Sequence, residues 1–116
     1  YTEGSTIIMP VHNKLVRDLI PNIIEGSGKA FTTRILDEEE YVKELRIKSK
    51  EELQEYLDAK DDESAIEELA DLLEIIHALS KVHGVDFNKV EEVRQQKAKK
   101  RGGFEERVFL IEVEDD

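Results

Sequence analysis

The stretch from Lys48 to Glu74 constrains the fold most, because it places acidic pairs inside two apolar helical faces. The pairs are Glu52 with Glu55 and Glu68 with Asp71. At about 100° per residue of an α-helix, all four side chains fall within or at the edge of arcs of leucine, isoleucine and tyrosine. Since 28 of 116 residues are Asp or Glu, the spacing alone is weak, and the position on the apolar arcs carries the information.

The connection between the two helices is short, which predicts an antiparallel pair. We expect the first helix over about Glu38–Asp58 and the second from Ala65 to about His83. Ser64 with Glu67 is the predicted capping box of the second helix. In such a pair the two acidic pairs lie at matching distances from the turn, so their carboxylates can converge.

Carboxylates turned toward a core cost several kcal/mol unless they are paired or bound to metal. A bound cation would meet that cost. Ligands that are all oxygen favour Mg²⁺, with Mn²⁺ as a second choice. A solvated, salt-bridged acidic helix pair is the alternative, and the residues alone leave both open.

The run EELQE, followed by EELAD, resembles the metal motifs of the MazG-like all-α nucleoside triphosphate pyrophosphohydrolases. This superfamily includes phosphoribosyl-ATP pyrophosphohydrolase. Four further stretches resemble a subgroup of small stand-alone members: His12–Asp18, Ser27–Lys29, Arg34–Asp37 and Lys97–Phe104. The resemblance therefore covers nearly the whole chain, from about Val11 to Val113.

The resemblance implies hydrolysis of a nucleoside triphosphate between the α and β phosphates, giving the monophosphate and pyrophosphate. House-cleaning of non-standard nucleotides is one such role. Mg²⁺ ions would be bound by Glu52, Glu55, Glu68 and Asp71. Phosphoribosyl-ATP hydrolysis in histidine biosynthesis is an alternative within the same fold. A non-enzymatic acidic helical module that binds a basic partner is an alternative of another class.

The catalytic base and the phosphate ligands are also expected near the acidic pairs. Glu51, or a metal ligand such as Glu52, would orient the attacking water. The chain has no glycine-rich phosphate loop, so side chains and metal must hold the phosphates. Lys48 is one candidate, and Lys14 and Arg17 are two more, although these two also fit ordinary surface charges.

Two further cations belong to a predicted helix over Phe87–Arg101. Val90 and Val93 start a short apolar stripe, and Lys97 and Arg101 continue it. Cations on an inward face are suited to binding phosphate. In the other interpretation, the aliphatic parts of the two side chains cover apolar surface while their charged ends reach water.

The rest of the chain predicts small elements. A short helix is expected over Leu19–Glu25 with Asp18 as its cap. Phe31–Leu36 and Val108–Val113 read as strands that pair. The expected fold is thus mainly α, an antiparallel helical bundle with a small two-stranded β element.

Composition sets the remaining expectations. We expect residues 1–10 to be a tail or an expression remnant and residues 11–116 to be a single domain. A net charge of −11 argues against nucleic-acid binding, which needs a basic surface. No apolar run is long enough for a membrane span, so a cytoplasmic protein is expected. The wide apolar arcs predict a homodimer or higher oligomer.

Overall fold

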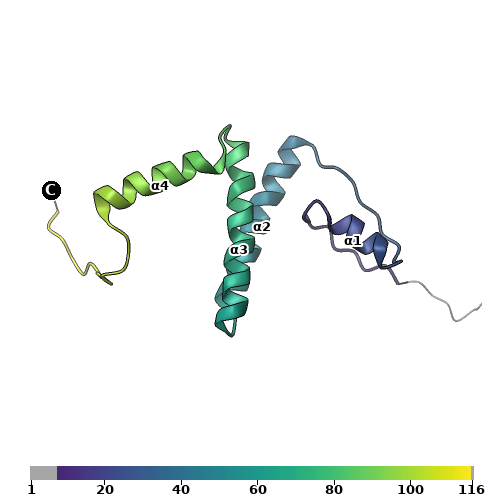
Figure 1. Cartoon of the computed structure of the whole chain (residues 1–116), viewed down its shortest axis with the longest axis horizontal. Helices are drawn as coiled ribbons and strands as arrows, with labels where there is room; N and C mark the ends of the chain where they lie inside the picture. The colour runs from purple at the N-terminus through teal and green to yellow at the C-terminus, as the bar shows by residue number, and fades with distance from the viewer. Residues whose placement is uncertain (1–7, 116) are drawn as a thin grey trace, which may run out of the picture. The chain divides into compact units, whose positions relative to one another are not determined.

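The computed structural model describes residues 8–115, and within them the chain is helical with no strand. Figure 1 labels the helices α1 (Ile20–Gly26), α2 (Glu38–Asp58), α3 (Asp62–Val82) and α4 (Phe87–Arg101). They form two compact units, the first ending at Leu79 and the second beginning at Ser80, within α3. The mainly α class is confirmed. Residues 1–7 of the predicted tail lie outside the described part, and the extent of a single domain stays a prediction.

Helix α2 begins and ends at the predicted residues. Its cap is Asp37, whose side chain accepts a hydrogen bond from the backbone N–H of Glu40 at 2.8 Å. Acidic residues fill the first turn, where the positive end of the helix dipole favours them. The buried residues of this helix are Leu45 and Glu52, an apolar side chain and a carboxylic acid. The burial of Glu52 matches its expected position on the apolar arc.

Helix α3 begins three residues earlier than predicted, and the proposed capping box of Ser64 and Glu67 is wrong. The carboxylate of Asp61 accepts the backbone N–H of Ser64 at 2.7 Å, so Ser64 lies within the first turn. Asp62 and Glu63 lie in the same turn, before Ser64, where the helix dipole again favours acidic residues. The earlier start leaves a tighter connection to α2, and the two helices run antiparallel side by side (Figure 1).

The end of α3 follows the prediction closely. Gly84 has a positive φ of 79°, the left-handed conformation that glycine adopts most easily. Its N–H donates to the carbonyl of Lys81, and the N–H of Val85 donates to the carbonyl of Ser80. These two bonds satisfy carbonyls at the helix end. Helix α4 also has its predicted bounds, and it ends at Gly102, whose φ is 82°.

The short helix α1 is shifted by one residue from its prediction. Leu19 takes the cap position, and no side chain caps the helix, so the prediction of Asp18 as the cap is wrong. A turn that closes from the N–H of Ile20 to the carbonyl of Arg17 precedes the helix. Pro21 then lies in the first helical turn, where its missing N–H costs nothing.

The predicted two-stranded β element is not present in residues 8–115. Phe31–Leu36 and Val108–Val113 have no regular secondary structure, and they belong to different units. Strand propensity in a short segment stabilises a strand only when a neighbouring strand completes the hydrogen-bond ladder. Apolar and β-branched composition was therefore a misleading signal at both positions.

The apolar core of the described chain is small. Leu45, with 2% of its surface exposed, is its one buried apolar residue. Large apolar side chains remain exposed on both long helices of the first unit, namely Leu53, Leu57, Ile66, Leu69 and Leu73. The antiparallel pair therefore leaves much of its apolar surface in water.

Candidate metal centre

Three of the four predicted metal ligands converge between α2 and α3. Glu52 and Glu55 lie one helical turn apart on α2, and Glu68 lies near the start of α3. Each offers a carboxylate oxygen, and these oxygens all lie within 4.8 Å of one another. Of the four carboxylates that were expected to converge, three thus do so in the structure.

Two oxygens of this cluster are buried and have no hydrogen-bond partner within the described residues. They are Oε2 of Glu52 and Oε2 of Glu68. Glu52 as a whole is only 7% exposed, although it is a charged residue type. A buried carboxylate oxygen without a partner costs free energy, so the arrangement calls for a positive charge or a proton.

The protonation of the cluster reflects this crowding. Burial raises the pKa of Glu52 from 4.5 to about 7, and its hydrogen bond to Glu55 and the charge of that residue add to the rise. A hydrogen bond that the protonated carboxyl group of Glu68 donates to Glu55 is the main cause that raises the pKa of Glu68, followed by burial. In the absence of a cation, these carboxyl groups therefore retain protons to higher pH than ordinary glutamates.

The residues present fit a divalent cation. Their donors are all carboxylate oxygens, the ligands that hard cations such as Mg²⁺ prefer. The unpartnered oxygens of Glu52 and Glu68 supply acceptors that no protein donor uses. A cation would also neutralise the mutual repulsion that raises the pKa of both groups.

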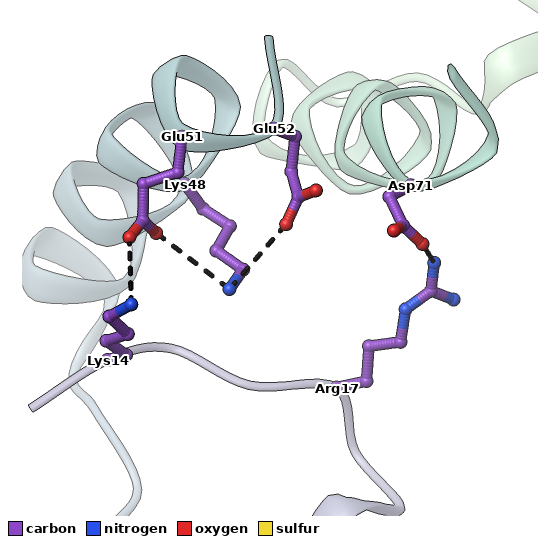
Figure 2. Close-up of polar contacts among 6 residues, drawn as sticks. All are labelled: Lys14, Arg17, Lys48, Glu51, Glu52 and Asp71. Atoms are coloured by element: carbon purple, nitrogen blue, oxygen red, sulfur yellow. Dashed lines mark hydrogen bonds and ion pairs between the residues drawn. The ribbon is translucent and has the colours of Figure 1, made fainter. Parts of the chain in front are cut away.

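Asp71, the fourth predicted ligand, lies outside this three-carboxylate cluster. Its Oδ1 accepts a hydrogen bond from the guanidinium of Arg17 at 2.7 Å, and the two form an ion pair (Figure 2). Asp71 is still close enough to raise the pKa of both Glu52 and Glu68 by its charge. Asp71 therefore borders the cluster, and the guanidinium of Arg17 balances its charge.

Glu51 and the lysines form the other border of the cluster (Figure 2). Lys14 Nζ lies 3.3 Å from Glu51 Oε1, and Lys48 Nζ lies 3.8 Å from Glu51 Oε2. Lys48 also lies 3.7 Å from Glu52 Oε1, so it links the predicted base to a cluster carboxylate. The structure thus brings Lys14, Arg17 and Lys48 to the acidic residues, and their expected binding of phosphate stays a prediction.

The two cations predicted on α4 are in the second unit. Lys97 and Arg101 are exposed there, and Val93 of the same stripe is exposed as well. Lys99, Lys100 and Arg101 form the last turn, where the negative end of the helix dipole favours cations. A role for Lys97 and Arg101 at the cluster stays a prediction.

The acidic partners of Lys14 and Arg17 were not predicted from the sequence. We expected these residues to bind phosphate, and the structure pairs them with Glu51 and Asp71. The only sign of these ion pairs in the sequence was that the two basic residues precede segments rich in acidic residues. Such a signal does not select which acids are contacted across 54 residues of sequence.

The fold and the cluster define an all-helical protein with a carboxylate site of the kind that binds divalent cations. The family model described as phosphoribosyl-ATP pyrophosphohydrolase matches residues 14–98. The chain belongs to this family, which is part of the MazG-like all-α nucleoside triphosphate pyrophosphohydrolase superfamily, so the resemblance is confirmed. The family indicates a hydrolase that releases pyrophosphate from nucleotides.

Searches of curated proteins and of solved structures return no match to this chain. No helix in the described part of the chain combines the length and apolar character needed to traverse a bilayer.

Proposed function

We propose that the protein is a Mg²⁺-dependent pyrophosphohydrolase that cleaves a nucleoside triphosphate between its α and β phosphates. The observation that carries the proposal is the cluster of Glu52, Glu55 and Glu68, with its two buried, unpartnered oxygens. In a pyrophosphohydrolase family, a site that calls for a cation and borders several basic side chains suits a polyphosphate substrate.

A divalent cation in such a site supplies charge neutralisation and lowers the pKa of bound water. Glu52, Glu55 and Glu68 would hold it, with Asp71 as a fourth ligand from the border of the cluster. Glu51 is the proposed base that orients the attacking water, and Glu52 is the alternative. Lys48 contacts both side chains, at 3.8 Å from Glu51 and 3.7 Å from Glu52.

The basic side chains would hold the phosphate oxygens. Lys48 is three-quarters buried at its side chain and lies between Glu51 and Glu52, so its ammonium group already faces the site. Lys14 and Arg17 border the site from the N-terminal segment. Lys97 and Arg101 of α4 are further proposed phosphate ligands, on the sequence pattern alone. An arginine can hold two phosphate oxygens at once.

Phosphoribosyl-ATP is a second candidate substrate, because the description of the matching family names it. Both candidates carry a polyphosphate from which pyrophosphate can leave, so the cluster serves either. The base and ribose contacts would separate them. A screen of nucleoside triphosphates and phosphoribosyl-ATP, each with Mg²⁺ and scored for pyrophosphate release, identifies the substrate.

Our first prediction concerns the cluster carboxylates. Glu52→Gln and Glu68→Gln should each lower Mg²⁺-dependent pyrophosphate release by roughly a hundredfold or more, because even residues that only orient ligands are worth 10- to 100-fold. Glu67→Gln is the matched control, since Glu67 is the exposed neighbour of Glu68 on α3. Full activity in the two cluster variants, or pyrophosphate release that persists in chelator, would contradict a role of the cluster as the metal site. Absence of pyrophosphate release from every nucleotide with the unaltered protein would favour a non-enzymatic acidic module.

A further inference from the structure

The segment that precedes α1 carries two cations to opposite borders of the acidic cluster. Lys14 pairs with Glu51 of α2, and Arg17 pairs with Asp71 of α3 (Figure 2). Residues 8–17 belong to no helix or strand, and these two ion pairs tie the segment to the long helices. The segment therefore lies along the edge of the site through charge.

The carboxylates of the site differ in whether a basic side chain already pairs with them. Asp71 holds Arg17 at 2.7 Å, and Glu52 has Lys48 at the longer distance of 3.7 Å. Within the described residues, Glu55 and Glu68 have no ion pair with a lysine or arginine. A divalent cation can thus enter at Glu52, Glu55 and Glu68 directly, whereas Asp71 becomes available only when Arg17 leaves.

The ion pair of Arg17 with Asp71 is weak enough to be exchanged. The two side chains are 56% and 41% exposed, and exposed pairs contribute little in water. A dication in the cluster would attract Asp71 with twice the charge of a guanidinium and would repel Arg17 at the same time. Both effects favour replacement of Arg17 by the dication as the partner of Asp71.

We infer that Arg17 is a displaceable counter-ion of Asp71, released when a divalent cation binds to Glu52, Glu55 and Glu68. The released guanidinium then faces the site as a ligand for the incoming polyphosphate. Metal binding, movement of the N-terminal segment and exposure of a phosphate-binding arginine are coupled in this way. The inference rests on the proposed function, because it requires that the cluster binds a divalent cation.

Mn²⁺ affinity provides the first test, because loss of the free Mn²⁺ signal in electron paramagnetic resonance measures binding without turnover. In Arg17→Gln protein Asp71 has no competitor, so the affinity for Mn²⁺ should rise roughly two- to fivefold, the range of an exposed ion pair. Arg34→Gln is the matched control: Arg34 pairs with Glu40 at the same 2.7 Å and with similar exposure, and neither belongs to the site.

A second control separates exchange at Asp71 from a general effect of charge. Lys14→Gln removes one positive charge from the same segment but breaks only the contact with Glu51. It should change Mn²⁺ affinity less than Arg17→Gln does. Equal increases in the two variants would overturn the inference, because charge alone would then explain both.

Movement of the segment is the second test. The chain has no cysteine, so Val11→Cys offers a single exposed site for a nitroxide label. Addition of Mg²⁺ should increase the mobility of the label in a protein with Arg17, and should leave it unchanged in Arg17→Gln, where the contact with Asp71 is already absent and, of the two ion pairs, only that of Lys14 with Glu51 holds the segment. A label that responds to Mg²⁺ equally in both proteins would contradict the inference.

The outcomes for the two proposals are distinct. Absence of Mn²⁺ binding in the unaltered protein would overturn the metal site itself and the inference with it. Normal Mn²⁺ binding, with the same affinity in the unaltered protein and in Arg17→Gln, would overturn only the role of Arg17.

Discussion

Glu52 is the residue whose chemistry depends most on its surroundings. Its side chain is only 9% exposed, and Glu55 lies close to it. One of its oxygens has no hydrogen-bond partner within residues 8–115. A folded-state pKa of about 7, compared with the ordinary 4.5, means that folding forces this group to hold its proton. In the metal-free protein, ionisation of Glu52 is therefore unfavourable at the position where a cation is proposed to bind.

Our second prediction follows from this shift. Between pH 4.5 and 7 the folded chain keeps the proton on Glu52 while the unfolded chain has lost it, so the free energy of unfolding falls as the pH rises. One pKa unit corresponds to about 1.4 kcal/mol, so we expect a loss of at least about 1 kcal/mol across this window. Chemical denaturation in chelator at several pH values measures it.

Glu52→Gln is the control for this pH dependence. Glutamine cannot ionise, so the variant should be more stable than the unaltered protein at pH 7.5 and should lose less stability over the window. Glu40 and Asp61 have lowered pKa values, so their own contributions fall below this range. A variant that is less stable at pH 7.5 would show that Glu52 is a structural partner of Lys48 instead.

Our third prediction concerns Lys97 and Arg101. If they bind phosphate, Lys97→Ala and Arg101→Ala should each cost about 1.5 to 3 kcal/mol in kcat/KM, the scale of a charge-assisted hydrogen bond. Mn²⁺ affinity should not fall. Lys99→Ala and Lys100→Ala remove the same charge from the same helical turn and serve as controls. Equal kinetics in all four variants would exclude a specific role.

At the scale of elements, the start of α3 gives the fourth prediction. Asp61→Ala should lower the free energy of unfolding by about 1 kcal/mol, because the backbone N–H of Ser64 loses its acceptor. Asp61→Asn keeps an acceptor at the same position and should cost much less. If Ser64→Ala is instead the more damaging change, the capping box first expected at Ser64 is correct after all.

The elements that the sequence predicted well are those whose signals are local. The start of α2 and the end of α3 were predicted closely, and the structure shows a local cause at each, since Asp37 caps α2 and Gly84 follows the end of α3 with a positive φ. Glu52 was predicted to face inward because helical periodicity needs no knowledge of the partner helix. The convergence of Glu52, Glu55 and Glu68 followed from the short connection alone.

The features that the sequence did not predict depend on distant parts of the chain. Arg17 contacts Asp71, and no local rule selects that acid among so many. Val108–Val113 has strand composition, but a strand also requires a partner. At α3 the predicted cap was Ser64, whereas Asp61 caps the helix and gives a longer helix with favourable acids in its first turn.

At the scale of the molecule, exposed apolar surface on α2 and α3 gives the fifth prediction. Leu57 and Ile66 are each more than 60% exposed, and burial of such surface against a second copy would stabilise both chains. Light scattering should therefore detect a dimer or larger oligomer at micromolar concentration. Ile66→Lys should shift the protein toward monomer, while Glu67→Lys, on the exposed face beside it, should not. A monomeric unaltered protein would refute the prediction.

The extended apolar segment near the C-terminus bears on aggregation. Val108, Phe109, Leu110 and Ile111 are 74 to 87% exposed, and a short β-prone run of this kind can stack with copies of itself into cross-β assemblies. Acidic residues flank it closely, at Glu105, Glu106, Glu112, Glu114 and Asp115. Repulsion between these gatekeepers opposes stacking of identical chains, so part of the large negative charge of this protein acts against fibril formation.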